Sequence, residues 1–471
     1  MGMSLEVAEE WIGRQTPEVQ AVVRMMLARI AELESELAKL RERINKSPQN
    51  SSLPPSSQHP HGMRPSGKTK STRKRGGQPG HPKRERPLLP PEQCNQVHTL
   101  KPHECRRCRH RLNGADAEPL RHQVWELPEI KPIVTEYQRH RLSCPRCGAS
   151  TCAALPPDIP TSQAGPRLTA LTALLMGCFR QSKRRVALFL EQILGQPCSP
   201  GWVVKLQRRA MKALRPNWNE LAGQLPFQDN LGIDETATKE AAQKSWLWDF
   251  VAKKFTDFAL RPTRAATVLE EILGGKFRGV ANCDRAKMYW SLGRLQWCWA
   301  HLKRDFQALV DSADRAARRL GHDLLRPTGE LFRHWSRYRN GALSRRGFVR
   351  SMQPVRTKIE NLLLRGAYSG NDAMTGMCNE LYDHREWLWN FVEVPGVEPT
   401  NNVSERALRP AVIWRKLSFG TQSEGGSRFV ETMLTVVETC RQQGRNIFDH
   451  LVKALESHLV SQPPPSLLPG A

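Results

Sequence analysis

Three acidic residues have the side chains and the settings that metal-assisted chemistry needs. Asp234 ends an apolar run that begins at Leu231, and Asp284 ends a run that begins at Gly279; both runs are typical of strands. Glu405 lies where a helix is expected to begin. Two carboxylates at neighbouring strand ends and a third on a helix can hold two divalent metal ions, about 4 Å apart, at a phosphodiester. Because most acids in any chain lie on solvated faces, spacing alone does not establish this site.

The elements around the two aspartates indicate how they would be brought together. Strands are predicted over 231–233, 245–252, 255–260 and 277–283, with helices over 263–273 and 299–306. The order strand, strand, strand, helix, strand fits a ribonuclease H-like α/β core, in which the first and fourth strands pair in parallel. That pairing would place Asp234 beside Asp284. Residues 311–395 have helical patterns throughout, as an insertion ahead of Glu405 would.

The charge of the chain points to a polyanionic partner. The 471 residues carry a formal net charge of +25 at pH 7, and nucleic acid is the commonest partner of so basic a protein. No run of 18 apolar residues predicts a membrane span, and the acidic start of the chain does not have the pattern of a signal peptide. Most of the twelve cysteines lie outside any disulfide-like framework, which suits a reducing cytoplasm.

The N-terminal region carries a heptad repeat between residues 17 and 45. Apolar residues fill every a and d position, namely Val23, Ile30, Leu37 and Ile44 at a and Val19, Met26, Leu33 and Leu40 at d. So narrow an apolar stripe is best buried against another helix, which predicts a coiled coil and, most simply, a homodimer. The alternative is an amphipathic helix that packs on its own domain.

Residues 46–91 have the composition of a disordered linker. They hold ten Lys or Arg and one Glu and almost no large apolar side chains, so they cannot offset the entropy of ordering. The basic cluster from Lys68 to Arg75 could neutralise DNA phosphates without reading sequence. The alternative is a linker that is merely solvated.

Two CxxC pairs indicate a structural zinc site. Cys105 and Cys108 form one pair, and Cys144 and Cys147 form the other, with a spacer of 35 residues between them. Four thiolates close a tetrahedral zinc site and leave no position open for catalysis. Alternating stretches in the spacer, at 123–127 and 133–137, predict strands of a zinc ribbon. The alternative is two unrelated thiol pairs, because the spacer is longer than usual.

The segment that follows predicts two helices joined by a short turn. One helix is expected from Ser182 to Leu194, with Gly195 at its end, and Ser199 caps the next. Such a pair resembles a helix-turn-helix, although helix pairs are common in proteins without that function. The candidate DNA contacts of this pair are Arg184, Arg185, Lys205, Arg208 and Arg209.

These features together resemble the insertion sequence 66 family of transposases, in the same order over about residues 19–455. The resemblance is carried by the double CxxC and by Asn50-Ser-Ser-Leu-Pro-Pro-Ser-Ser57, Gly76-Gly-Gln-Pro-Gly-His81, Cys298-Trp-Ala-His301-Leu-Lys-Arg304 and Asn401-Asn-Val-Ser-Glu405-Arg406-Ala-Leu-Arg409-Pro410. It implies a DDE transposase whose acids fall on Asp234, Asp284 and Glu405, with two catalytic Mg or Mn ions and one structural Zn. The residues that flank Asp234 and Asp284 differ from the commonest sequence of the family. This difference weakens the assignment of neighbouring contacts more than the assignment of the two aspartates.

The implied partners are double-stranded DNA, both element ends and target, a second copy of the chain, and accessory proteins of the same element. The implied setting is a bacterial cytoplasm, at the nucleoid. Further candidate DNA contacts are Arg285, Lys287, His301, Arg304, Arg409 and Lys416. His301 could equally be a core residue, and Pro410 could kink the helix that carries Arg409 and Lys416. The other functions considered are a non-catalytic DNA-binding regulator and a structure-selective nuclease.

The expected organisation is therefore a multidomain α+β protein. Its expected parts are a coiled-coil helix (1–45), a basic linker (46–91), a zinc ribbon (92–160), a helix-turn-helix region (161–225), the first part of the core (226–310), a helical insertion (311–395), the second part of the core (396–456) and a disordered tail (457–471).

Overall fold

The computed structural model describes residues 11–45, 87–370 and 372–468. The chain divides into two compact units, Pro60–Val134 in one and Met1–His59 with Thr135–Ala471 in the other, and each is described by itself. Within the described ranges no helix has the length and apolar character needed to cross a membrane.

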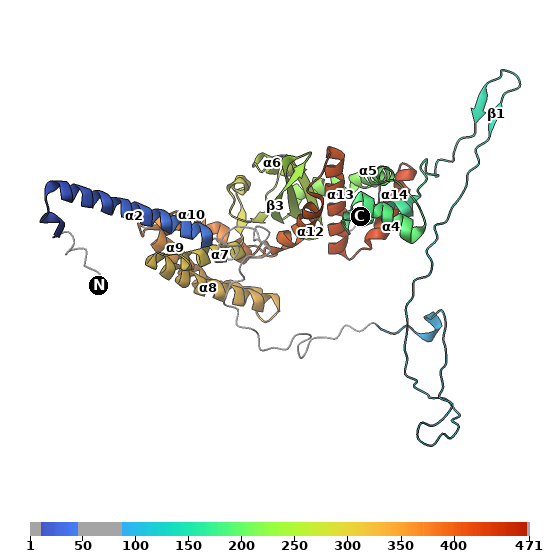
Figure 1. Cartoon of the computed structure of the whole chain (residues 1–471), viewed down its shortest axis with the longest axis horizontal. Helices are drawn as coiled ribbons and strands as arrows, with labels where there is room; N and C mark the ends of the chain where they lie inside the picture. Colours follow the sequence, from blue (N-terminus) through green and yellow to red (C-terminus); the bar gives the residue numbers. More distant parts are fainter. Residues whose placement is uncertain (1–10, 46–86, 371, 469–471) are drawn as a thin grey trace. The chain divides into compact units, whose positions relative to one another are not determined.

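A five-stranded mixed sheet forms the centre of the larger unit (Figure 1). Its strands are β3 (Asn230–Glu240), β4 (Gln243–Val251), β5 (Thr256–Arg261), β6 (Val280–Cys283) and β7 (Leu295–Trp297). They lie in the order β5-β4-β3-β6-β7; β4 runs antiparallel to β3 and β5, whereas β6 pairs in parallel with β3 and β7. Helix α6 (Thr267–Leu273) lies between β5 and β6 in the chain. This topology confirms the predicted strand order and is consistent with a ribonuclease H-like core.

Both faces of the sheet are covered by apolar side chains. On one face Trp248 and Phe250 belong to the main core, and on the other Leu247 and Val251 pack with residues of α12 (Asn402–Ser418). The alternation along β4 is the period of two that a strand buried on both faces gives. Figure 1 shows α12 and α13 (Glu424–Gln443) beside the sheet. Helix α12 continues through Pro410 to Ser418, so the proline does not end it.

The helical insertion predicted over 311–395 is confirmed as helical. It follows α7 (Trp299–Val310) and consists of α8 (Arg315–Arg339), α9 (Arg345–Ala367), α10 (Asp372–Asp383), the 3-10 turn η5 (Arg385–Leu388) and α11 (Asn390–Glu393). Helices α7 to α10 pack in sequence, each on the next. The insertion therefore leaves the sheet after α7 and returns to it just before α12.

The helix pair ahead of the sheet also forms where its caps predict it. After α3 (Pro166–Gly177), α4 spans Lys183–Leu194, with Ser182 as its N-cap and Gly195 in the left-handed conformation at its end. Helix α5 (Pro200–Gln224) starts at the cap Ser199, whose side chain accepts the Trp202 N–H. A 3-10 turn, η3 (Leu225–Phe227), then leads into β3.

The end of the chain differs from the expected disordered tail. Helix α14 (Ile447–Leu459) is followed by a segment whose Leu467 is fully buried. Asn217 Nδ2 donates to the Pro465 carbonyl at 2.9 Å, and Gln443 Nε2 donates to the Leu467 carbonyl at 2.7 Å. A buried leucine and side-chain amides that bond the backbone can fix a proline-rich segment that has no regular structure.

The remaining elements lie nearer the N-terminus. Helix α2 (Pro17–Asn45) leaves most of its apolar seam exposed, so the coiled coil stays a prediction. After the 3-10 turn η2 (Pro91–Gln93), the strands predicted at 123–127 and 133–137 are absent, because their alternating apolar side chains are exposed and meet no core. A short hairpin, β1 (Arg141–Ser143) with β2 (Ser150–Cys152), forms instead. The basic cluster at 68–75 lies outside the described residues.

Candidate active site

The sheet brings the two aspartates to neighbouring positions. β3 and β6 pair in parallel with Gly232 opposite Asn282, and Asp234 and Asp284 each follow two residues later. Asp284 comes directly after the end of β6, as predicted, whereas Asp234 lies within β3, because that strand continues to Glu240 on its pairing with β4. Adjacent strands lie about 4.8 Å apart, so this register sets the two carboxylates side by side. Asp284 Oδ1 accepts the Ala286 N–H at 2.8 Å, which fixes its side chain at the strand end.

A buried acid, Asp249, lies beside Asp234 on the next strand. The two residues are directly opposite in the β3–β4 ladder, and the Asp234 N–H donates to Asp249 Oδ1 at 2.9 Å. Asp249 is fully buried and its Oδ2 has no hydrogen-bond partner. Burial raises the pKa of Asp249 well above its ordinary value, and the neighbouring Asp234 raises it further.

Asp234 itself stands in a concentration of negative charge. Burial is the main cause that raises its pKa well above the ordinary value, and Glu235, Asp284 and Glu405 raise it further. These interactions place all three other carboxylates within electrostatic reach of Asp234. Such a cluster is costly unless cations or protons compensate it.

Glu235 lies on the opposite face of β3 and is compensated by its neighbours. Arg264 forms an ion pair with it, and the hydroxyl of buried Tyr289 donates to its second oxygen. Burial raises the pKa of Glu235, and Asp284 raises it further, while Arg264 and Tyr289 oppose the change. Tyr289 in turn packs edge-on against Trp248, so this network holds the strand that carries Asp234.

The first turn of α12 carries Glu405, and the preceding loop is anchored to the core. Asn401 Nδ2 donates to the Ile233 carbonyl at 2.8 Å, next to Asp234. Asn282 Nδ2 donates to the carbonyls of Glu398 and Thr400 at 2.7 and 3.2 Å. The Asn401 N–H also reaches the Cys298 sulfur at 3.2 Å. Strands β3 and β6 and the start of α7 thus fix where α12 begins.

Helix α7 contributes two basic side chains to the same place. His301 Nε2 lies 3.5 Å and an Arg304 guanidinium nitrogen 3.6 Å from Glu405 Oε1. Neither contact has hydrogen-bond geometry, and Glu405 Oε1 is buried without a partner. Burial, followed by the charge of Arg304, lowers the pKa of His301, which therefore favours the neutral imidazole.

These observations fit a site for divalent cations with oxygen ligands. Asp234, Asp284 and Glu405 supply carboxylates from two strands and a helix, the donors that Mg²⁺ and Mn²⁺ prefer. The unpartnered Glu405 oxygen and the uncompensated charge around Asp234 are what a bound cation would relieve. The structure places Asp284 and Glu405 within electrostatic reach of Asp234, and a metal site formed by all three acids stays a prediction.

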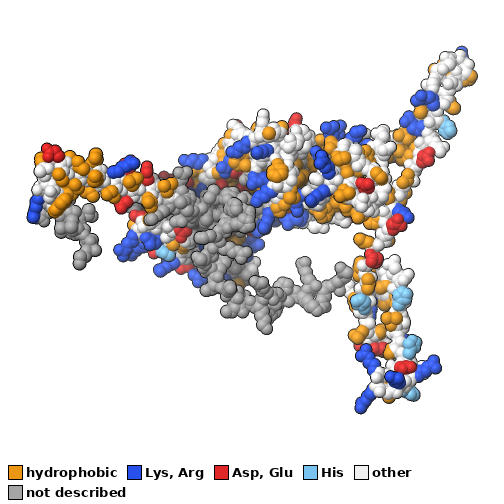
Figure 2. Space-filling view, in the orientation of Figure 1, with side chains coloured by type: hydrophobic (Ala, Val, Ile, Leu, Met, Phe, Trp, Pro, Cys, Tyr) orange, Lys and Arg blue, Asp and Glu red, His pale blue; other side chains and the backbone are white. Residues whose placement is uncertain are grey.

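The candidate DNA contacts fall into three groups in the structure. Exposed cations are found on α4, α5, η4 (Lys287–Leu292) and α12, namely Arg184, Arg185, Lys205, Arg208, Lys287, Arg409 and Lys416. Half-buried His301 and Arg304 face Glu405. Two are committed elsewhere: Arg285 pairs with Asp305 and Glu380 at 3.2 and 3.1 Å, and Arg209 bonds Ser162 and Ala164. Figure 2 shows Lys and Arg outnumbering acids on the visible face of the part that holds the sheet.

Each CxxC pair forms the same tight turn. The N–H of Cys105 donates to the His110 carbonyl, and the N–H of Cys144 donates to Ala149, at 2.9 and 2.8 Å. Hydrogen bonds from the turn, first from the backbone at Cys108 and Cys147, lower the pKa of Cys105 and Cys144. Donors aimed at a sulfur favour the thiolate, which is the form that binds zinc. The two turns belong to different compact units, so a shared ion stays a prediction.

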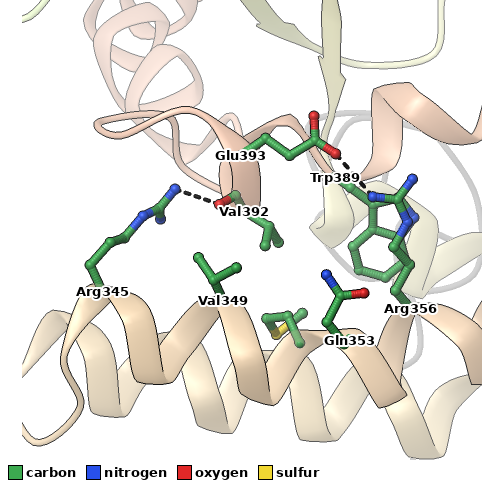
Figure 3. A pocket seen from close by; sticks show the side chains of 8 residues that line it. Arg345, Val349, Gln353, Arg356, Trp389, Val392 and Glu393 are labelled. Carbon is green, nitrogen blue, oxygen red and sulfur yellow. Dashed lines mark hydrogen bonds and ion pairs between the residues drawn. The ribbon is translucent and has the colours of Figure 1, made fainter.

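A pocket of about 180 Å³ lies away from the acids, in the helical insertion (Figure 3). Arg345 lines one end and donates to the Val392 carbonyl, while Arg356 pairs with Glu393 at 2.9 Å on the other side of the pocket. Trp389 forms part of the wall between them. Both arginines are occupied by contacts that join α9 to α11, and we assign this pocket no ligand.

Comparison with known protein families identifies the part of the chain that carries this site. Residues 161–428, more than half of the chain, match the family described as "Transposase IS66 family". The chain belongs to the IS66 family of transposases. The match includes Asp234, Asp284 and Glu405 together with the insertion between the last two.

The N-terminal region and two relatives add to this assignment. Residues 9–87 match a "Family of unknown function (DUF6444)". In Sinorhizobium fredii (strain NBRC 101917 / NGR234), the "Uncharacterized protein y4qI" is 28% identical over 245 residues, which are 45% of this chain and 43% of the relative. The "Uncharacterized protein y4jO" is 26% identical over 166 residues, 34% of this chain and 47% of the relative. This chain therefore matches less than half of the length of either relative.

Several residues of this IS66 family site were not found from the sequence. The place of Asp249 and Glu235 in the site follows from the register of the strands, which the sequence does not show. The contacts of Asn282 are made with a loop more than 100 residues further along the chain. Asn401 alone had a local signal, because it stands at the start of a predicted helix, but its bond to β3 could not be foreseen.

Proposed function

We propose that this chain is a DDE transposase that binds the ends of its insertion element and carries out cleavage and joining of DNA strands. Membership of the IS66 family supports the class of reaction. The observation that supports the site assignment is that Asp234 and Asp284 lie on paired parallel strands, and that Asp284 and Glu405 are both within electrostatic reach of Asp234.

The three acids have distinct tasks in this proposal. Asp234, within β3, and Asp284, just after β6, would hold the cations, and Glu405 would complete the set from α12. Two Mg²⁺ or Mn²⁺ ions held there would supply Lewis-acid activation of a water or a 3′ hydroxyl and would stabilise the leaving oxygen. Both reactions are in-line displacements at phosphorus, so one set of ligands serves cleavage and joining.

The surrounding cations position the DNA. Arg304 and neutral His301 lie next to Glu405, where they can donate to the phosphate oxygens of a strand at the acids. Arg409 and Lys416 are exposed on α12, four and eleven residues beyond Glu405, which is roughly one helical face. A backbone laid along that face would reach both.

The other regions would bind and pair the element ends. The exposed cations of α4 and α5 would contact DNA as a helix-turn-helix does. The exposed apolar seam of α2 would pair two copies of the chain. The two CxxC turns would bind one structural zinc ion. Accessory proteins encoded by the same element would be further partners.

Isosteric replacement of the acids tests the proposal. Asp234→Asn, Asp284→Asn and Glu405→Gln should each lower Mg²⁺-dependent cleavage of DNA carrying the inverted repeats that flank the gene, on the order of 10³–10⁴-fold, without additive effects in combination. Binding to the same DNA should change little. Glu398→Gln is the matched control, because Glu398 pairs with Arg339 on the helical insertion.

Two outcomes would decide against parts of this assignment. If Glu405→Gln kept full cleavage and Glu398→Gln lost it, Glu398 would replace Glu405 as the third catalytic acid. DNA binding without metal-dependent cleavage by the unmodified chain would favour a regulator over an enzyme.

A further inference from the structure

A second set of metal-binding atoms adjoins the three acids and shares one of them. The sulfur of Cys298, a ring nitrogen of His301 and a carboxylate oxygen of Glu405 all lie within 4.8 Å of one another. Cys298 caps the start of α7 and His301 follows three residues later, so one helical turn presents both side chains to Glu405. The four-cysteine proposal above does not involve these residues.

His301 and Glu405 each carry one polar atom without a hydrogen-bond partner, and the other ring nitrogen of His301, Nε2, lies 3.5 Å from Glu405 Oε1. His301 Nδ1 and Glu405 Oε1 are both buried and make no hydrogen bond among the described residues. Unpaired buried polar atoms cost free energy, and a bound ion is one of the ways in which proteins satisfy them.

The chemistry of the donors selects a different ion from Mg²⁺. A thiolate and an imidazole are ligands for Zn²⁺, whereas Mg²⁺ prefers an all-oxygen set. Zinc bonds of about 2.0–2.3 Å to sulfur, nitrogen and oxygen suit atoms whose mutual separations stay below 4.8 Å. Cys298 is buried, and because zinc binds the thiolate, its binding would displace the thiol proton to solvent.

We propose that Cys298, His301 and Glu405 form a Zn²⁺ site, and that zinc bound there inhibits the enzyme by withdrawing Glu405 from the catalytic cations. Among the described residues, a Glu405 oxygen lies within 4.8 Å of the ligand atoms of Cys298 and His301 but forms no such group with the two aspartates, so an ion held by the thiol and the imidazole would compete for Glu405. The inhibitory half of this inference rests on the proposed function; zinc binding does not.

A substitution at Cys298 can separate its role as a metal ligand from its role in holding the loop before α12. The Cys298 sulfur also accepts the Asn401 N–H at 3.2 Å and so helps to place the loop before α12. In Cys298→Ser a hydroxyl oxygen can still accept that N–H, but the soft metal ligand is lost. Cys198→Ser is the matched control, because Cys198 is a half-buried thiol in the turn before α5.

The first test counts zinc on the full-length protein by competition with a chromophoric chelator. The unmodified chain and Cys198→Ser should bind one more tight zinc ion per chain than Cys298→Ser, and His301→Ala should match Cys298→Ser. Thermal unfolding of each variant checks that the fold is retained. The same zinc count in all four proteins overturns the site.

The second test follows cleavage in a fixed concentration of Mg²⁺ while Zn²⁺ is added, with each variant normalised to its own rate in Mg²⁺ alone. Cys298→Ser should raise the inhibitory zinc concentration at least tenfold relative to Cys198→Ser. Equal inhibition of the two variants, despite a difference in zinc count, overturns the inhibitory role. Absence of cleavage in Mg²⁺ alone would instead contradict the proposed function, and the zinc count would still decide the site.

Discussion

Gly232 offers a way to displace Glu405 without changing any acid. A Cβ at this position of β3 would lie 2.5 Å from the Ser404 Oγ and 3.1 Å from the Asn401 Oδ1, on the first turn of α12 and just before it. Ser404 is fully buried, and Asn401 is held by its bond to the Ile233 carbonyl. Gly232→Ala therefore pushes on α12 one residue away from Glu405.

The size of the effect follows from the contact distance. Ordinary contacts of a Cβ begin near 3.4 Å, so a contact of 2.5 Å requires that α12 or Ser404 give way by about 0.9 Å (3.4 − 2.5). A misplacement of about 1 Å can cost roughly 100-fold in rate. Overpacking of this kind costs about 1–3 kcal/mol of stability. We expect cleavage to fall roughly 100-fold while DNA binding is kept and Tm drops by a few degrees, about 2–4 °C per kcal/mol.

Cleavage kinetics on DNA carrying the element ends, with differential scanning calorimetry, measure both quantities. Gly223→Ala in α5 and Gly329→Ala in α8 are matched controls, because a Cβ at either position meets no atom within 4 Å; both should keep full activity and gain stability from helix propensity. Gly232→Ala with Ser404→Ala removes the clashing hydroxyl and should recover most of the rate. Wild-type cleavage by Gly232→Ala, or no recovery in the double variant, would refute the reasoning.

Three other predictions concern regions away from the acids. His450 on α14 is buried, with Nε2 3.3 Å from Asn217 Oδ1, and burial lowers its pKa to about 4. The free energy of unfolding should be level above about pH 6.5 and fall by up to about 1.4 kcal/mol per unit toward pH 4; urea titration should show a flatter profile for His450→Gln. Leu33→Lys with Leu37→Lys should reduce self-association of the full-length chain by light scattering, since both side chains are exposed on the α2 seam; an already monomeric parent would contradict the coiled coil. Elemental analysis should find structural zinc that Cys105→Ser or Cys144→Ser reduces; a zinc-free parent would exclude the site.

The fold of the core could be predicted where local signals are strong. Each cap around α4 and α5 is a residue with a physical preference for that position: Ser182 and Ser199 at the starts, and Gly195 at a left-handed end. The strand that ends at Cys283 is a short apolar run with a change of character at its end. The end of β3 was not predicted, because the strand continues past Asp234 to Glu240. The three cap positions are determined by the conformation of a single residue, for which the sequence carries a direct signal.

Features that depend on partners distant in the chain could not be predicted. Strand β7 is only Leu295–Trp297, too short to show a period, and it exists because β6 offers it a parallel edge. Apolar and polar side chains alternate over residues 123–127 as in a strand. No strand forms there, because no hydrophobic core packs against the apolar side chains. The segment around Leu467 has the composition of a tail but finds a buried position. In each case tertiary contacts decided the outcome, not local preference.

In the candidate site, too, the chemical type of a side chain could be predicted but its contacts could not. Charge alone made Arg285 a candidate DNA contact, but its ion pairs with Asp305 and Glu380 tie the end of β6 to α7 and α10. Asp249 had no motif, yet its place opposite Asp234 follows at once from the β3–β4 register. A sequence gives the chemical type of each residue, whereas the residue with which its side chain interacts is known only from the fold.

The long insertion between Asp284 and Glu405 raises the question of what keeps the third acid in place. The helices of the insertion pack mainly on one another and on α7, and the loop that returns to the core is fixed by side-chain amides: Asn230 to the Gly396 carbonyl, Asn282 to Glu398 and Thr400, and Asn401 to Ile233. An amide can donate to a backbone carbonyl without adding charge beside the carboxylates, which an arginine or a lysine could not do. The position of Glu405 therefore depends on three asparagines at the sheet edge and in the loop, which hold the end of the insertion against the strands.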